Sequence, residues 1–450
     1  MATIFAPVTF PAKAGVTIIR ISGDDVAACL GALGVAKIPA PNQIKLCQIF
    51  DPQNGAQLDE ALISFFKAPH SFTGEDVAEI NIHASPFILK KITRILSSLE
   101  NVRLAQAGEF SKIAFLNGKI DLVQAEAIPD LIASETEAQH RQALQQLRGD
   151  LGAIYENWRF QVIELVALIE SCIDFPDEDL PQNIIDEVEN KLQKLQQEIA
   201  AHLDDGQCGQ KIKEGLSLAI IGAPNVGKSS LLNFLAKNDV AIVSEVAGTT
   251  RDVIEIHLEI AGVVLKIADT AGMRESEDKI EQEGIKRAKK RAAQSDIKIL
   301  MIDAAITAQA AQYKFVEEID DKTIIVVNKI DLLKNYEALK NIDEVYQKHV
   351  DKIVFLSLKE KQNLENLIKK LEEKVLEILP KQSNPLITQE RYRQCLSEAV
   401  AALENFSLEK NIELAAEDLR IACGAISKIS GRVDVDEILD VVFSRFCIGK

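Results

Sequence analysis

The chain has 450 residues, of which 47% are hydrophobic and 26% are charged, and its formal net charge is −17. This length predicts two to four domains, and the composition is that of an ordinary globular protein. The acidic net charge argues against broad, nonspecific binding of phosphates, but it does not exclude a local basic site. The seven cysteines have no C-x-x-C or zinc spacing, and no apolar run has membrane-spanning length. We therefore expect reduced thiols in a cytoplasmic chain with no signal peptide and no membrane partner.

Residues 1–118 have the pattern of an α+β domain. Three strand-like runs lie at 16–21, 61–66 and 78–83, with Pro and Gly between them, and the last of them alternates clearly between apolar and polar residues. The stretch 71–76 predicts a turn with a helix cap. His83 stands alone at a strand end, and we interpret it as a surface or hydrogen-bonded structural histidine.

Two regions, 119–211 and 379–450, have apolar residues at helical spacing. The spacing of three and four residues is clearest from Leu151 to Ile169 and from Ile185 to Leu203. The Asp/Glu cluster at 174–178 separates these two runs. We interpret it as a solvated turn rather than a metal site.

A phosphate-binding motif lies between the helical regions, in residues 212–378. An apolar run ends at Gly222, and Gly227, Lys228 and Ser229 complete the pattern G-x-x-x-x-G-K-[ST] between a predicted strand and helix. Glycines let the backbone curl around a phosphate, and the exposed N–H groups and the helix N-terminus hold the anion. Lys228 is expected to reach the β- and γ-phosphates, and the Ser229 hydroxyl to bind Mg²⁺.

Three further motifs follow predicted strands. Asp269–Gly272 is expected near Mg²⁺ and the γ-phosphate. In Asn328–Asp331, the Asp331 carboxylate would accept hydrogen bonds from guanine N1 and N2, which adenine cannot offer. Ser357–Lys359 would close over the base. Because α/β sheets bind ligands at the carboxyl ends of their strands, this order of motifs predicts a GTPase.

The first switch of such a GTPase would be the stretch Ser244–Asp252. Within it, Thr250 is the expected ligand of Mg²⁺ and the γ-phosphate. Arg251 fits both an arginine finger supplied in cis and an ordinary surface arginine. Met273 stands where many GTPases keep the glutamine that orients the attacking water. Either hydrolysis is very slow, therefore, or another residue supplies that function.

The residues expected to bind GTP are Asn225, Val226, Gly227, Lys228, Ser229, Ser230, Ser244, Glu245, Val246, Ala247, Gly248, Thr249, Thr250, Asp269, Thr270, Ala271, Gly272, Asn328, Lys329, Asp331, Ser357, Leu358 and Lys359. We interpret the basic run 286–291 as a solvated helix face rather than a tRNA contact. The predicted fold class is multidomain, α/β and α, with the GTPase domain inserted between two halves of a helical domain.

Blocks outside the GTP motifs carry a specific resemblance. They are Ser-Phe-Thr-Gly-Glu-Asp at 71–76, Gly-Glu-Phe at 108–110, Ala-Phe-Leu-Asn at 114–117, Asp-Leu-Val-Gln-Ala-Glu-Ala at 121–127, Ile-Asp-Phe-Pro-Asp-Glu at 173–178 and Cys-Ile-Gly-Lys at 447–450. With Gly-Thr-Thr-Arg-Asp at 248–252 and Asp-Thr-Ala-Gly-Met-Arg-Glu at 269–275, they make the whole chain resemble the MnmE (TrmE) family of tRNA-modification GTPases.

The resemblance implies a domain organisation. An N-terminal tetrahydrofolate-binding and dimerisation domain would occupy 1–118. A helical domain would occupy 119–211 and 379–450, and a Ras-like P-loop G domain, inserted in it, would occupy 212–378.

The resemblance also implies site residues. Glu281 matches the family's catalytic glutamate, which bridges to the attacking water in place of the missing glutamine. The implied K⁺ ligands are Asn225, Ser244, Val246 and Thr249, and the implied folate contacts are Arg20, Glu79, Lys119 and Lys450. A carboxylate suits the amino-pyrimidinone edge of a pterin, and basic groups suit the folate carboxylates. Cys447 lies near the folate pocket in the family, and both a reactive thiol and a packed, inert thiol fit it.

The implied function is GTP hydrolysis, dependent on Mg²⁺ and K⁺, coupled to modification of the wobble uridine (U34) of tRNA. A homodimer of the chain would work with the flavoprotein MnmG (GidA), in a heterotetramer or a larger complex. Together they would add a carboxymethylaminomethyl or aminomethyl-type group at C5, using the one-carbon unit of a 5-formyl- or 5,10-methylene-type tetrahydrofolate derivative. The alternative is a ribosome-assembly GTPase without modification chemistry, and the N-terminal blocks favour the first function.

Overall fold

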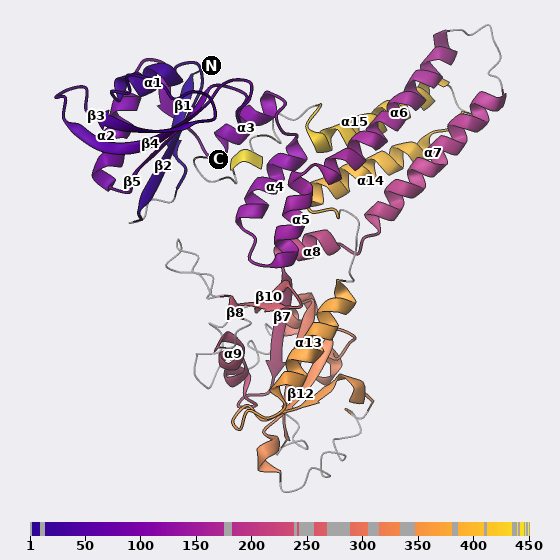
Figure 1. Ribbon diagram of the computed structural model, residues 1–450. Coiled ribbons are helices and arrows are strands. Elements are labelled where there is room, and N and C mark those ends of the chain that lie inside the picture. The colour runs from indigo at the N-terminus through magenta and orange to yellow at the C-terminus, as the bar shows by residue number, and fades with distance from the viewer. Residues whose placement is uncertain are drawn as a thin grey trace. The chain divides into compact units, whose positions relative to one another are not determined.

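The computed structural model describes residues 2–9, 14–174, 182–237, 241–242, 256–267, 289–304, 315–333, 346, 348–379, 386–408, 412–433, 439, 442–444, 446 and 449. The chain forms two compact units (Figure 1). Unit 1 comprises Met1–Ile132, Leu144–Ile199 and Gln394–Lys450, and unit 2 comprises Ala133–Ala143 and Ala200–Arg393. The main segment of unit 2 therefore interrupts unit 1 in the sequence, as an inserted domain does. The division into three domains with the boundaries given above stays a prediction.

Unit 1 begins with a six-stranded sheet, which confirms the predicted α+β pattern. Its strands in spatial order are β3 (Ile44–Phe50), β4 (Gln57–Phe66), β5 (Val77–His83), β2 (Val16–Ser22), β1 (Thr3–Pro7) and β6 (Val102–Leu104), and only the β1–β6 pair is parallel. Helices α1 (Val26–Ala32) and α2 (Pro86–Ser97) share one core with the sheet, in which Ile80 and Ile92 are fully buried. Residues 71–75 form bends in place of the predicted turn, and the predicted helix cap is wrong, because the run beyond them forms strand β5.

The described residues in the rest of unit 1 are mainly helical, as the apolar spacing predicts. Its helices are α3 (Glu109–Leu116), α4 (Leu122–Ile132), α6 (Asp150–Asp174), most of α7 (Gln182–Leu203), most of α14 (Glu390–Asn405) and α15 (Ile412–Ser430). Helix α6 buries residues at helical spacing from Leu151 to Ile169 and packs against α15, beside which it runs in Figure 1. Gly431 follows α15 with φ +81, and a Cβ there would lie 2.7 Å from the Phe115 ring, so only glycine fits this helix end.

Unit 2 is built on a seven-stranded sheet. Its strands in spatial order are β13 (Ile353–Phe355), β12 (Thr323–Asn328), β11 (Ile297–Asp303), β7 (Leu216–Gly222), β10 (Val263–Ile267), β9 (Ile256–Ile260) and β8 (Ala241–Ile242). The first five are parallel to their neighbours, and β9 and β8 continue the sheet antiparallel. Every residue of β11 and β12 is buried, as expected for parallel strands covered on both faces.

Two apolar cores cover the two faces of this sheet. Leu218 of β7 belongs to the core that contains Leu231 of α9 (Lys228–Lys237) and Leu367 of α13 (Leu364–Ile378). Ala219, the next residue, belongs to the other core, together with Tyr346. Short 3-10 helices lie in the loops of this unit, at Val316–Glu318, Ile330–Leu332 and Val350–Lys352. Because β7, β11 and β12 are parallel neighbours in the sheet, their carboxyl ends lie side by side at one edge.

Unit 2 also contains the segment 133–143 and the two ends of the inserted stretch. Gln139 Nε2 of α5 (Glu137–Leu147) donates to the main-chain oxygen of Lys213, 3.0 Å away, in α8 (Cys208–Glu214). His257 Nδ1 of β9 lies 2.9 Å from Glu135 Oε2. Arg393 donates to Leu203 O at 2.7 Å and to Asp205 Oδ1 at 2.6 Å. The chain therefore enters and leaves the inserted stretch through segments that are hydrogen-bonded to each other.

Among the helices within the described residues, none has both the length and the apolar character needed to cross a bilayer.

Candidate nucleotide-binding site

The predicted phosphate loop connects β7 to α9, at the edge of the sheet where the parallel strands end. Gly222 has φ +146, and a Cβ there would lie 2.4 Å from the main-chain oxygen of Met301. Gly227 has φ +108, and a Cβ there would lie 2.4 Å from Asn328 Nδ2. Both positions therefore exclude every residue except glycine, because the backbone torsion and the neighbouring atoms leave no room for a side chain. Helix α9 begins at Lys228, so its first N–H groups face the loop.

Lys228 holds the loop together through its ammonium group. Its Nζ donates to Gly222 O at 2.9 Å and to Ala223 O at 2.7 Å. Burial lowers the pKa of this ammonium below its usual range. An ammonium has three donors, so one remains for an anion. Ser229 and Ser230, in the first turn of α9, are exposed and accessible to a metal ion or a phosphate.

Asn328, at the end of β12, connects the phosphate loop to the loop that follows β13. Its Nδ2 donates to Val226 O at 2.8 Å, and its Oδ1 accepts a hydrogen bond from Leu358 N at 3.2 Å. The side chain is almost fully buried. Both ends of the amide therefore take part in hydrogen bonds inside the protein, and Asn328 holds the two loops together.

Asp331 and Ser357 form the part of the site that would read the base. Ser357 Oγ donates to Asp331 Oδ1 at 2.6 Å and accepts a hydrogen bond from Glu360 N at 3.1 Å. Ser357 is fully buried, so this contact orients the carboxylate. Lys359 is exposed and lies 3.8 Å from the Glu360 carboxylate. The structure thus brings Asn328, Asp331 and Ser357 together, as the order of the motifs predicts.

Lys329 belongs to the loop that follows β12, residues 328–331, which we call the base loop, and it connects this loop directly to the phosphate loop. Its backbone is left-handed, with φ +66, and its Nζ donates to Asn225 O at 2.8 Å. Asn225 is itself left-handed, with φ +61. The same Nζ lies 2.6 Å from Asp303 Oδ2. The sequence analysis missed Asp303, and the signal that points to it is its place at the end of a buried strand next to the other motif-bearing strands.

Several predicted residues lie outside the described residues. They are the switch residues Ser244–Thr250 with Arg251, the stretch Asp269–Gly272 with Met273, the catalytic candidate Glu281, the C-terminal Cys447 and Lys450, and residues 175–178 of the acidic cluster. Of the basic run 286–291, the described Lys289 forms an ion pair with Glu318 at 3.4 Å. No group of three or more His, Cys, Asp or Glu side chains arranged to hold a metal ion occurs among the residues that the structure describes.

Two of the predicted folate residues meet in the N-terminal sheet. Arg20 of β2 and Glu79 of β5 are register partners, and Arg20 Nε and Nη2 both donate to Glu79 Oε1, at 2.9 and 2.7 Å. The guanidinium also lies 5.7 Å from the ring centroids of Phe72 and Phe110. Lys119 Nζ donates to Pro69 O at 2.9 Å, in the loop that carries Phe72.

His83 is confirmed as a surface, hydrogen-bonded histidine. Its ring is largely exposed, and its Nδ1 lies 2.7 Å from Asp59 Oδ1. The same carboxylate accepts a hydrogen bond from the His83 main-chain N–H at 2.8 Å. The Asp59 side chain therefore caps the end of β5.

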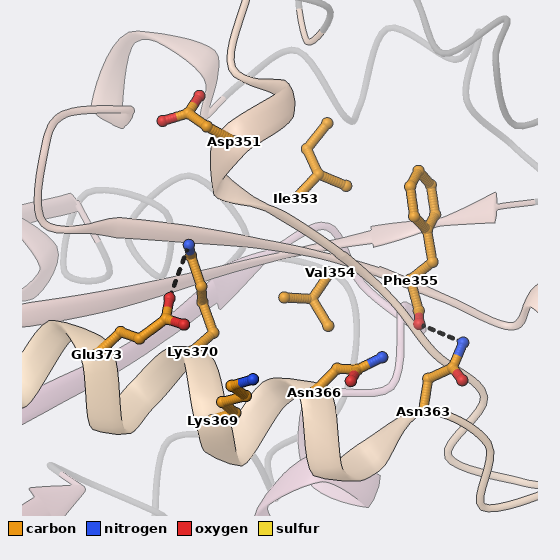
Figure 2. Close-up of a pocket in the computed structure, with 9 residues that line it drawn as sticks. All are labelled: Asp351, Ile353, Val354, Phe355, Asn363, Asn366, Lys369, Lys370 and Glu373. Atoms are coloured by element: carbon orange, nitrogen blue, oxygen red, sulfur yellow. Dashed lines mark hydrogen bonds and ion pairs between the residues drawn. The ribbon is translucent and has the colours of Figure 1, made fainter.

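A separate cavity of about 360 Å³ lies between the edge strand β13 and helix α13 (Figure 2). Ile353 and Phe355 line it from the strand. From the helix side, Asn363 donates to Phe355 O at 3.1 Å, and Lys370 forms an ion pair with Glu373 at 3.1 Å. None of the predicted GTP-binding residues lines this cavity, so it is distinct from the nucleotide site.

Comparison with known proteins covers the whole chain. A family model described as "GTP-binding protein TrmE N-terminus" matches residues 3–119, and one described as "MnmE helical domain" matches residues 122–447. Proteins named "tRNA modification GTPase MnmE" from Rickettsia canadensis (strain McKiel) and Rickettsia bellii (strain OSU 85-389) are 45% and 44% identical to it over 451 residues, covering 100% of each chain. A protein of the same name from Paramagnetospirillum magneticum is 43% identical over 450 residues, covering 100% of this chain and 99% of its own.

A solved structure of Era in complex with MgGDPNP and nucleotides 1506–1542 of 16S ribosomal RNA is similar to part of the chain. It is 28% identical with a TM-score of 0.29, covering 42% of this chain and 66% of that chain.

Proposed function

This chain belongs to the MnmE (TrmE) family of GTPases, and from that premise we propose that it couples GTP hydrolysis to the modification of tRNA. The observation that carries the proposal is the similarity over the full length to proteins named as tRNA modification GTPases. It includes the N-terminal 117 residues matched at 3–119, which lie outside the GTPase motifs. A GTPase of another function would share only the nucleotide motifs.

GTP would bind across the three loops at the end of the unit 2 sheet. The phosphate loop, with Lys228, would hold the phosphates, while Asp331, oriented by Ser357, would accept the guanine N1 and N2 hydrogens. Ser229 and Thr250 would hold Mg²⁺, which neutralises charge on the phosphates. Ser229 is exposed at the first turn of α9, which suits a hydroxyl ligand.

A K⁺ ion beside the phosphates would replace an arginine finger. Its ligands would be Asn225, Ser244, Val246 and Thr249, and the left-handed, exposed Asn225 supports this role for the phosphate loop. A fixed cation there neutralises charge that develops during hydrolysis. We expect turnover to be faster in KCl than in NaCl at equal ionic strength. Equal rates in the two salts would remove K⁺ from the proposal.

Glu281 would orient the attacking water, in the role that Met273 cannot fill. We expect Glu281→Ala to lower the rate of hydrolysis by roughly a hundredfold or more, because general-base or water-orienting groups contribute on that scale. The dissociation constant for GTP should stay close to that of the wild-type protein, since the phosphate loop and Asp331 are intact. A wild-type rate in the variant would reassign this residue.

The N-terminal domain would bind a tetrahydrofolate derivative through Arg20, Glu79, Lys119 and Lys450. Both Arg20 donors go to Oε1 of Glu79, so the second carboxylate oxygen is available to the amino-pyrimidinone edge of a pterin. The ammonium of Lys119, on an exposed stem, suits a folate carboxylate. Tetrahydrofolate supplies a one-carbon unit when bound. With the flavoprotein MnmG as partner, that unit would end at C5 of the wobble uridine of tRNA, in the cytoplasm.

The N-terminal sheet would also form a homodimer. Ile44 and Leu46 of β3 and Leu62 of β4 are exposed, and Leu46 and Leu62 are register partners. The three side chains therefore lie on one face of the sheet. We expect Leu46→Lys to lower the mass in solution from that of two chains to that of one, 49.6 kDa, by light scattering. A wild-type mass for this variant would place the dimer interface elsewhere.

Nucleoside analysis of tRNA from cells that lack the gene tests the function as a whole. We expect wobble uridines without the C5 group, restored by the wild-type gene and not by the Glu281→Ala variant. Normal tRNA together with immature ribosomal subunits would overturn the proposal in favour of a ribosome-assembly GTPase.

A further inference from the structure

Asp303 is a buried carboxylate at the same sheet edge as the nucleotide motifs. It is the last residue of β11 and is the register partner of Asn328 on β12. Only 4% of its side chain is exposed. A carboxylate buried to this extent must be paired with a positive charge or with several donors.

Lys329 supplies that positive charge, and it brings two loops to one point. Its Nζ is 2.6 Å from Asp303 Oδ2 and donates to Asn225 O at 2.8 Å. Lys329 and Asn225 both have left-handed backbones, which cost free energy for residues other than glycine. The contacts at the ammonium oppose this cost in both loops.

The two lysines of the site differ in the acceptors that surround them. Lys228 donates to two main-chain carbonyl oxygens, so its positive charge is uncompensated by these partners and is available to phosphate. Lys329 is paired with a carboxylate, so its charge is already neutralised. Lys329 is therefore suited to holding loops in place rather than to attracting the anion.

We propose that Asp303 is a positioning residue for guanine-nucleotide binding. By pairing with Lys329 it holds the base loop, residues 328–331, against Asn225 of the phosphate loop before the nucleotide arrives. Binding then requires less ordering of the two loops, and such preorganisation strengthens affinity. The inference rests on the proposed nucleotide site, because it assigns a role to a residue that supports that site without touching the ligand.

The test is the full-length Asp303→Asn variant, with Asp321→Asn as the matched control. Asp321 is a fully exposed carboxylate that forms an ion pair with Lys352 at 3.0 Å, and it precedes the first residue of β12, at the opposite end of that strand from Asn328. We expect Asp303→Asn to raise the dissociation constants for fluorescent GDP and GTP about tenfold, because the loss of a hydrogen bond to a charged group weakens binding by about this factor. The dissociation rate should rise with them, and KM for GTP should rise by a larger factor than kcat falls. The control should match the wild-type protein in each measurement.

A second variant keeps the test decisive if Asp303→Asn does not fold. Lys329→Gln removes the other partner, whose side chain is one-third exposed. Where Asp303→Asn does fold, the double variant should bind GDP no more weakly than Lys329→Gln alone, because the two residues act as one unit. Affinities within twofold of the wild type in Lys329→Gln, or additive effects in the double variant, would overturn the proposal. Failure of the proposed site itself is distinguishable, since then Asp331→Asn would leave GTP binding unchanged as well.

Discussion

The pair formed by Arg393 and Asp205 joins the two ends of the inserted stretch, and its removal should loosen both. Arg393 makes a 2.7 Å hydrogen bond to Leu203 O and a 2.6 Å ion pair with Asp205, and the two side chains are 15% and 6% exposed. Among the described residues, Oδ2 of Asp205 has no hydrogen-bond partner. Arg393→Gln therefore leaves a buried carboxylate that retains little beyond its 2.8 Å hydrogen bond from Gln207 N.

Breaking a buried ion pair by removing one partner costs about 3–5 kcal/mol. Because the hydrogen bond from Gln207 N remains, we expect the lower end of that range, about 3 kcal/mol. By the relation of roughly 1.4 kcal/mol per factor of ten, the local opening constant should rise about a hundredfold. Hydrogen–deuterium exchange of α8, which follows Gln207, measures this opening directly.

Arg420→Gln is the matched control. Arg420 lies 2.8 Å from the Glu170 carboxylate, a distance close to that of the buried pair, but it is 49% exposed. Exposed pairs contribute little, so exchange around Glu170 should change by less than about twofold. Unchanged exchange of α8 in Arg393→Gln, or an equal effect of the two substitutions, would refute the reasoning from burial.

Three further results are expected. Asp331→Asn should weaken GTP binding by roughly a hundredfold in a fluorescence titration, because an amide cannot accept both guanine hydrogens; unchanged affinity would place the base elsewhere. Gly222→Ala, whose Cβ would lie 2.4 Å from a main-chain oxygen, should lower the free energy of unfolding by roughly 3 kcal/mol. Gly262→Ala, at φ +78 with no atom within 4 Å of the added Cβ, should cost about 1 kcal/mol in the same thermal unfolding assay; equal losses would refute the steric argument. Burial raises the pKa of the Cys29 thiol to about 11. Iodoacetamide at pH 8 should therefore modify Cys29 only after unfolding, and rapid labelling of the folded chain would contradict this. Because the thiol ionises more readily in the unfolded chain, it should also make the fold less stable as the pH rises above about 9.

The sequence predicted the parts of the site that depend on local chemistry. Gly222 and Gly227 could be recognised because a phosphate loop restricts backbone torsions at fixed spacing, and Asp331 because its carboxylate has a defined hydrogen-bonding partner in guanine. The apolar run 323–327 predicted a strand because parallel strands are apolar on both faces, and it forms most of β12.

Asp303 and Arg393 could not be found in this way. Asp303 pairs with a lysine 26 residues further along the chain, and Arg393 pairs with an aspartate 188 residues earlier. Such pairs depend on strand order and on how connecting segments meet, and neither leaves a periodic pattern in the sequence. The docking of residues 133–143 in unit 2 was missed for the same reason, since Glu135 meets His257 only after both have folded.

The division of unit 1 into three separate stretches has a consequence for how the chain is made. Helix α6 is complete at Asp174, but its partner α15 begins only at Ile412, after the main segment of unit 2 has been synthesised. At about 5–20 residues per second, the apolar stripe of α6 waits on the order of tens of seconds without that partner. During this interval residues 200–393 emerge as one continuous stretch and can fold first. The main segment of unit 2 is therefore complete on the ribosome while the helical part of unit 1 still lacks α15.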